Sequence, residues 1–231
     1  EAALMAARRQ REEIVTEDFE QARDKIMMGI ERDEVITDEE KEMIAYHESG
    51  HALVAELLPH ADPLQKVSII PRGGSLGATE QIPEKERYTM KKAYLLDRIA
   101  IMLAGRAAEK IKYDDVSTGA GDDLKKATQL ARRMVCQWGM SDAVGPVVYK
   151  KGEPHPFLGR ELAEDKDYSE HTAQLIDEEI KKITLEMEER AREALNDHLE
   201  ELDALAAALL EHETLSREDI DAIVKKADVA N

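Results

Sequence analysis

The sequence is poor in aromatic residues and holds a single cysteine. Phe, Trp and Tyr make up only 4% of the 231 residues, whereas hydrophobic residues make up 42%. The core must therefore be built from Leu, Ile, Val, Met and Ala, a composition that favours helices. Cys136 cannot form a disulfide within the chain, which fits a reducing compartment. It stands in the apolar stretch MVCQWGM, where a buried structural thiol is expected.

Basic residues are outnumbered by acidic ones, 32 Lys and Arg against 50 Asp and Glu, and long apolar runs are lacking. The formal net charge is −18, and an acidic surface repels phosphate backbones, so we expect no nucleic-acid partner. No apolar run is long enough to cross a bilayer. The start, EAALMAARRQREE, resembles no signal peptide and lacks an initiator Met, which indicates a fragment of a longer protein. The P-loop motif G-x-x-x-x-G-K-[ST] is absent, which excludes ATP binding by that route.

Capping signals and helical periodicity predict the first elements. Residues 1–33 are expected to form two helices with a break at Thr16. Thr37 and Glu40 have the spacing of a capping box, which predicts that a helix begins there. Pro59 is expected to end that helix.

The whole chain is predicted to be mainly α, with a small β-sheet or hairpin. Val67–Ile70 and Leu76–Ile82 are rich in β-type residues, and the turn sequence PRGG separates them. Residues 145–160 are rich in Gly and Pro and are expected to be irregular. Further helices are expected from a cap at Thr89, over 122–140, over 169–212 with a break near Asn196, and from Ser216.

The stretch AYHESGHALV carries the sequence H-E-x-x-H as His47, Glu48 and His51. On a helix the two histidines lie one turn apart on the same face, so their imidazoles can bind one cation. Glu48 is placed to deprotonate a water that zinc has made acidic, which suits amide hydrolysis. A chance match among seven histidines has odds of roughly a few in a hundred. The capped amphipathic context, with both histidines facing inward, favours metal binding.

The sequence near the motif offers no third ligand. A metzincin would need Gly and His where Val54 and Leu57 stand, so that class is excluded. A gluzincin would use a Glu on a downstream helix, but Glu80 falls in a β-type stretch. The ligand must come from further along the chain. The other histidines are expected to have surface roles; they are His60, His155, His171, His198 and His212.

Several stretches resemble the peptidase domain of the FtsH family, the membrane-anchored ATP-dependent zinc metalloproteases. These are HESGHALVAELLP, DPLQKVSIIPRGGSLGATEQIPE, DDVSTGAGDDLKKATQLARRMV and PFLGRELAEDKDYSEHTAQLIDEEI. Ser49 stands where that family often has Ala. Residues 1–33 are similar to the end of the lid of the family's AAA ATPase module, which predicts a boundary before a zinc peptidase domain over 34–231.

The resemblance implies an FtsH-type peptidase fold that binds one Zn²⁺ per subunit, with Glu48 as the general base. It implies a homo-hexamer that degrades unfolded or membrane proteins, with ATP bound only in an ATPase module that these residues lack. It places the full-length protein on the cytoplasmic, matrix or stromal side of a membrane. Anchoring would use transmembrane segments that are absent here, so this fragment is expected to be soluble.

The resemblance also implies that the third zinc ligand is an Asp within GAGDDLKK. Asp123 is followed at helical spacing by apolar residues such as Ala127 and Met134, whereas Asp122 is followed by Lys126 and other polar residues. Asp123 is therefore expected to face the core and bind zinc. The alternative is that both carboxylates only favour the positive end of a helix.

Two other functions stay open at this point. The chain could be a helical adaptor or oligomerisation module with a structural zinc site, or a zinc hydrolase for a small molecule. A structural site is normally closed by four protein ligands and needs no base, so Glu48 favours an enzyme. The β-type stretch that includes Leu76, Gly77, Ala78 and Thr79 favours a peptide substrate, because an extended peptide can add to a strand edge.

Overall fold

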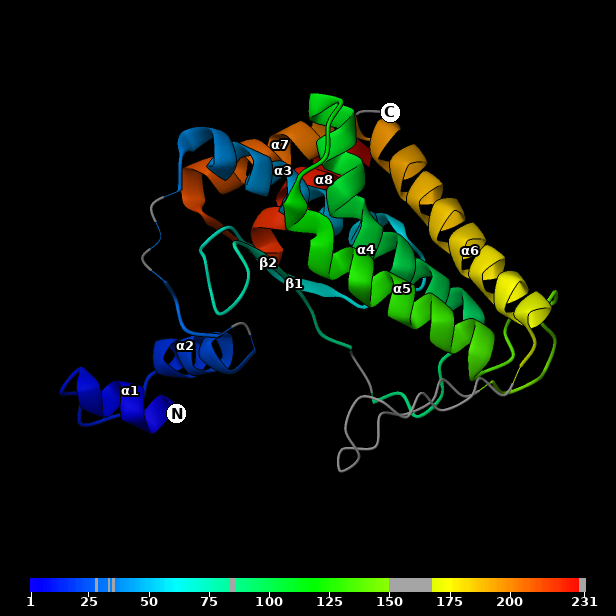
Figure 1. The fold of residues 1–231 in the computed structure, drawn as a ribbon. Coiled ribbons are helices and arrows are strands. Elements are labelled where there is room, and N and C mark those ends of the chain that lie inside the picture. The colour runs from blue at the N-terminus through cyan, green and yellow to red at the C-terminus, as the bar shows by residue number, and fades with distance from the viewer. Residues whose placement is uncertain (28, 33, 35, 84–85, 150–167, 229–231) are drawn as a thin grey trace.

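The computed structural model describes residues 1–27, 29–32, 34, 36–83, 86–149 and 168–228. The fold is mainly helical with one small sheet, as predicted (Figure 1). The irregular stretch is confirmed for 145–149, and its remainder, with His155, lies outside the described residues. The elements are α1 (Ala2–Arg8), α2 (Thr16–Met27), α3 (Asp38–Leu57), β1 (Leu64–Ser68), β2 (Ala78–Gln81), α4 (Lys92–Tyr113), the 3₁₀ turn η1 (Thr118–Ala120), α5 (Gly121–Cys136), α6 (Glu170–Asn196), α7 (Leu199–His212), β3 (Thr214–Ser216) and α8 (Arg217–Asp228).

Helix α3 carries the H-E-x-x-H motif and begins at the predicted capping box. The Thr37 hydroxyl accepts a hydrogen bond from the Glu40 backbone N–H, and the Glu40 carboxylate accepts one from the Thr37 N–H. The helix ends at Leu57, one residue before the Leu58 cap and two before Pro59. The second half of α3 is almost entirely buried, so its two histidines lie inside the protein.

Helix α4 packs closely along α3 because small residues line the contact. An added Cβ at Gly50 of α3 would lie 2.6 Å from the carbonyl oxygen of Ala104 in α4. Helices α5 and α6 also pack against α4, and α7 packs against α3 (Figure 1). These helices therefore enclose one core, with α3 and α4 at its centre. Leu53, Ile99, Leu103, Met134 and Leu205 are almost fully buried in it.

The sheet has three antiparallel strands in the order β2-β1-β3. Val67 of β1 pairs with Thr79 of β2 on one side and with Leu215 of β3 on the other. Strand β2 lies at the edge of the sheet, so one of its two edges is not paired within it. The prediction of a hairpin or small sheet is confirmed, and β3 is an addition to it.

Several predicted boundaries are wrong: β2 spans Ala78–Gln81 rather than Leu76–Ile82, and β1 ends at Ser68 rather than at Ile70. Strand β1 begins at Leu64, earlier than expected. The start was not predicted, because the polar residues Gln65 and Lys66 interrupt the run of β-type residues. Helix α4 begins at Lys92 after a Lys91 cap that makes no side-chain hydrogen bond, so Thr89 does not cap it. Helix α5 ends at Cys136 rather than at 140, and Gly139 then adopts φ +57°, a left-handed conformation that ends helices.

Helix α2 lies near the sheet, α1 packs against α2, and both lie away from α6 (Figure 1). Lys66 of β1 forms an ion pair of 2.6 Å with Asp24 of α2, and Arg23 lies 3.5 Å from the Glu80 carboxylate of β2. The two predicted helices are confirmed, whereas the assignment of residues 1–33 to an ATPase lid stays a prediction. Within the described ranges, none of the helices combines the length and the apolar character that a membrane span requires.

Candidate metal centre

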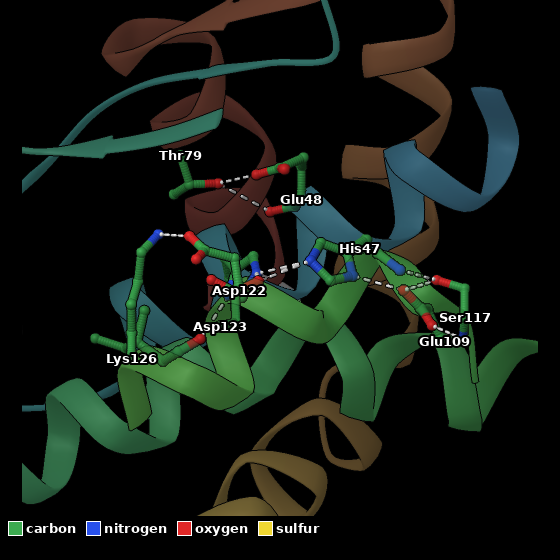
Figure 2. Close-up of polar contacts among 11 residues, drawn as sticks. His47, Glu48, Thr79, Glu109, Ser117, Asp122, Asp123 and Lys126 are labelled. Atoms are coloured by element: carbon green, nitrogen blue, oxygen red, sulfur yellow. Dashed lines mark hydrogen bonds and ion pairs between the residues drawn. The ribbon is translucent and has the colours of Figure 1, made fainter. Parts of the chain in front are cut away.

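Two helices bring His47, His51 and Asp123 together. The Nε2 atoms of the two histidines lie 3.0 Å apart, and Asp123 Oδ2 lies 3.3 Å from His47 Nε2 and 3.5 Å from His51 Nε2. Both histidines are buried in α3, and Asp123 is half-buried in the first turn of α5. Figure 2 shows His47 and Asp123 among the polar contacts of the site. The candidate ligand atoms all lie within 4.8 Å of one another.

The far side of each imidazole is fixed by a hydrogen-bond acceptor. His47 Nδ1–H donates to Glu109 Oε1 at 2.6 Å, and His51 Nδ1–H donates to the Ile101 carbonyl at 2.6 Å. Because a carbonyl or a carboxylate can only accept, each Nδ1 must carry the hydrogen. In the neutral rings both Nε2 lone pairs then face each other and the Asp123 carboxylate.

Three electron-pair donors facing one point repel one another unless a cation lies between them. Two imidazoles and a carboxylate are a ligand set that suits zinc, and acceptors behind metal-binding histidines are a regular feature of such sites. The residues present therefore fit a divalent metal of this kind. Three protein ligands would leave a coordination position for water, as catalytic zinc sites do.

The pKa values of His47 and Asp123 reflect the close approach of these side chains. Burial works to lower the pKa of His47, but hydrogen bonds to Asp123 and Glu109 and the nearby Glu48 charge outweigh it and raise this pKa to about 10. Burial works to raise the pKa of Asp123, but the two histidines hold it well below its usual range. A site with this affinity for positive charge binds either a proton or a metal, so metal binding must displace a proton.

Glu109 and Ser117 form the support behind His47. The Glu109 carboxylate is almost fully buried, and it accepts hydrogen bonds from the Ser117 backbone N–H at 2.7 Å and the Ser117 hydroxyl at 3.0 Å (Figure 2). Burial works to raise the pKa of Glu109, but His47 and Ser117 lower it, so the carboxylate stays ionised as an acceptor. Neither residue was predicted from the sequence, because nothing in their spacing connects them to His47.

Gly105 of α4 lies directly against both imidazoles. A Cβ built at this position would stand 2.6 Å from His47 Cε1, His47 Nε2 and His51 Nε2. Gly105 was not predicted from the sequence either. The available signal was a glycine in the middle of a helical pattern, which costs about 1 kcal/mol relative to Ala and therefore needs a reason.

Replacing Gly105 by Ala is expected to weaken zinc binding at least about tenfold while the helical fold persists. The new methyl group would occupy space that the two rings fill, and their Nδ1 hydrogen bonds prevent them from turning away. The measurement is a competitive zinc titration with a fluorescent chelator. Gly121→Ala is the matched control, since a Cβ there meets nothing within 4 Å. Equal affinity in the two variants would contradict the expectation.

Glu48 lies on the side of α3 that faces strand β2. Its side chain is buried, and its carboxylate accepts a hydrogen bond of 2.8 Å from the Thr79 hydroxyl (Figure 2). Asp122 is exposed and forms an ion pair of 2.7 Å with Lys126, on the solvent side of α5. The two neighbouring aspartates therefore face the directions that helical periodicity predicted, Asp123 toward the two histidines and Asp122 toward solvent.

The predicted substrate residues lie at the sheet edge near Glu48. Ala78 and Thr79 belong to β2, while Leu76 and Gly77 precede the strand, which is shorter than expected. Leu76 is exposed and Gly77 is buried. The remaining described histidines are outside the cluster: His60, His171 and His212 are exposed and His198 is half-buried. Cys136 is buried, as expected.

Comparison with known proteins identifies the family. The profile of peptidase family M41 matches residues 34–223. The ATP-dependent zinc metalloprotease FtsH of Nitrosococcus oceani is 54% identical over 225 residues, which cover 97% of this chain and 35% of that protein. The protein of the same name from Syntrophotalea carbinolica is 51% identical over 229 residues, 99% of this chain and 35% of that protein.

A third relative, ATP-dependent zinc metalloprotease FtsH 4 of Sphaerobacter thermophilus, is 50% identical over 224 residues, 97% of this chain and 34% of that protein. The chain thus spans about a third of the length of these relatives. Because the family profile covers most of the chain and the identities extend over nearly all of it, the chain belongs to peptidase family M41.

Proposed function

We propose that this chain is a zinc-dependent endopeptidase domain that hydrolyses peptide bonds of unfolded proteins. The observation that carries the proposal is the convergence of His47 Nε2, His51 Nε2 and Asp123 Oδ2, with Glu48 next to the first of them in α3. Family membership and the printed names of the relatives, zinc metalloproteases, support the same reading.

In this proposal His47, His51 and Asp123 hold the zinc, one per chain. A bound zinc supplies Lewis acidity, which lowers the pKa of a water and polarises the substrate carbonyl. Glu48 accepts the proton of the attacking water and then gives it to the leaving nitrogen of the scissile bond. Glu109 and the Ile101 carbonyl keep the two imidazoles oriented with Nε2 toward the metal.

We further propose that the substrate adds as an extended strand at Leu76, Gly77, Ala78 and Thr79. Strand β2 is an edge strand, and unpaired backbone groups at such an edge can bind an extended chain. Because Thr79 contacts Glu48, a chain on this edge would pass close to the base. This supports a peptide substrate over a small molecule.

The activity of a whole protein is proposed from its relatives. They are ATP-dependent, whereas the 231 residues contain no P-loop motif, so a separate ATPase module would supply unfolding and threading. We propose a homo-hexamer that is anchored in a membrane by other segments and that faces the cytoplasm, matrix or stroma. A structural zinc site is the weaker alternative, since the cluster within the described ranges offers three protein ligands rather than four.

Reconstitution with zinc tests this function. The purified chain is stripped with a chelator and titrated with Zn²⁺, and cleavage of denatured casein is followed. We expect no cleavage without zinc, and a rate that rises in proportion to zinc until one equivalent is bound. A stably folded substrate should resist cleavage with or without ATP. Cleavage at full rate by the stripped chain, or none by the zinc-loaded chain, would contradict the proposal.

A further inference from the structure

Strand β2 holds the Glu48 carboxylate from one side. The Thr79 hydroxyl lies 2.8 Å from Glu48 Oε2 and 3.4 Å from the Glu48 carbonyl oxygen (Figure 2). Among the described residues, Thr79 provides the only side-chain hydrogen bond to this carboxylate. Thr79 is held in turn by the sheet, because it pairs with Val67 of β1. A β-branched side chain on a paired strand has few rotamers, so the donor is nearly fixed in space.

The residue two positions earlier makes room for the other carboxylate oxygen. Gly77 is buried, and a Cβ built there would lie 2.7 Å from both Cγ and Oε1 of Glu48. The Glu48 carboxylate thus lies between a hydroxyl donor at Oε2 and a backbone segment without a side chain at Oε1. Both contacts come from the segment 77–79, which is separated from Glu48 by about thirty residues of sequence.

A general base works only when it is held within hydrogen-bond reach of the proton that it accepts. A glutamate on a helix has rotatable bonds that allow other staggered conformations. A fixed donor at one carboxylate oxygen and closely packed backbone beside the other would select a single conformation of the Glu48 side chain. Such support is what distinguishes a productive site from one with the correct residues held loosely.

We propose that Thr79 is a positioning residue for Glu48, with Gly77 providing the space that the carboxylate needs. This inference rests on the proposed function, in which Glu48 is the base. It adds that the strand edge and the base form one unit, so that the segment expected to bind the peptide also sets the position of the group that activates water.

The test compares Thr79→Val, which keeps the shape and removes the donor, with Thr79→Ser, which keeps the donor. Zinc content, thermal unfolding, kcat and KM for a fluorogenic peptide, and a crystal structure of each zinc-loaded variant are measured. Thr79→Val should lower kcat roughly 10- to 100-fold with KM within about twofold and zinc unchanged, because one hydrogen bond to a charged group is lost. Its Glu48 carboxylate should leave its wild-type position. Thr79→Ser should recover most of kcat.

The matched control is Thr184→Val in α6, where the hydroxyl donates to backbone carbonyls of its own helix. Wild-type kcat in Thr79→Val, or equal losses in Thr79→Val and Thr79→Ser, would overturn the inference. If Thr79→Val does not fold, Gly77→Ala serves as the second test, because its added methyl group would contact Glu48 Oε1. This variant should lower kcat while zinc is retained. An unchanged kcat in Gly77→Ala would overturn the inference.

Failure of the proposed function would look different. In that case the zinc-loaded wild-type chain would not cleave the peptide, or Glu48→Gln would cleave it as fast as wild type. Failure of the positioning role alone would leave an active wild type, an inactive Glu48→Gln and a fully active Thr79→Val.

Discussion

Replacing Glu48 by Gln is expected to abolish peptide hydrolysis while zinc remains bound. Gln has nearly the shape of Glu, and its side-chain oxygen can still accept the Thr79 hydrogen bond, but it cannot take a proton from water. Loss of a general base typically lowers kcat by roughly 10²- to 10⁴-fold. The measurement is kcat for a fluorogenic peptide together with metal analysis of the same sample.

Glu39→Gln makes the same chemical change at an exposed position in the first turn of α3 and serves as the control. It should keep both zinc and wild-type kcat. Substantial hydrolysis by a zinc-loaded Glu48→Gln chain would refute the role of Glu48 as the base. Loss of zinc from that variant would instead mean that Glu48 acts on the metal site rather than on the proton.

Asp123→Asn should remove most of the zinc and the activity, whereas Asp122→Asn should change little. The Asp123 carboxylate lies 3.3 and 3.5 Å from the two histidine Nε2 atoms, while Asp122 points to solvent and pairs with Lys126. An amide is a much weaker zinc ligand than a carboxylate, and we expect the affinity to fall at least about 100-fold, beyond the 10- to 100-fold typical of losing a supporting residue. Zinc retained after dialysis against a chelator measures the difference.

The two aspartates control for each other because they are adjacent in the first turn of the same helix and carry the same charge. Any general effect of acidity at a helix start would appear equally in both variants. Equal zinc retention, or stronger loss in Asp122→Asn, would show that the third ligand lies elsewhere.

Helical periodicity predicted which way each proposed ligand faces, whereas the segment that holds Asp123 was chosen from the family resemblance. The H-E-x-x-H spacing placed His47 and His51 on one face of α3, and the apolar residues that follow Asp123 turned it toward the core. These inferences succeed because they depend on helical geometry within a single element. The capping box at Thr37 and Glu40 was predictable for the same reason.

The residues that contact the proposed ligands and the proposed base could not be predicted in this way. Glu109 reaches His47 across 62 residues of sequence, and Thr79 reaches Glu48 across 31. Such contacts depend on how helices and strands pack, and no local pattern encodes that packing. Gly105 left a weak local signal, but only the contact between α3 and α4 explains it.

The sheet was predicted in outline only. Strand β3 has three residues and forms by pairing with β1, which lies far away in sequence. No local sequence pattern therefore predicted it. Strand β1 includes the polar residues Gln65 and Lys66, and Lys66 extends to Asp24 of α2 rather than to solvent. Both differences come from tertiary partners that override local propensity.

A crystal structure of the zinc-loaded chain, with anomalous data collected at the zinc absorption edge, tests whether His47, His51 and Asp123 bind the metal. We expect one strong anomalous peak per chain, about 2.0–2.2 Å from His47 Nε2, His51 Nε2 and an Asp123 oxygen, with a fourth position left to solvent. A peak at another set of residues, a fourth protein ligand that closes the site, or the absence of any peak between α3 and α5 would contradict this expectation.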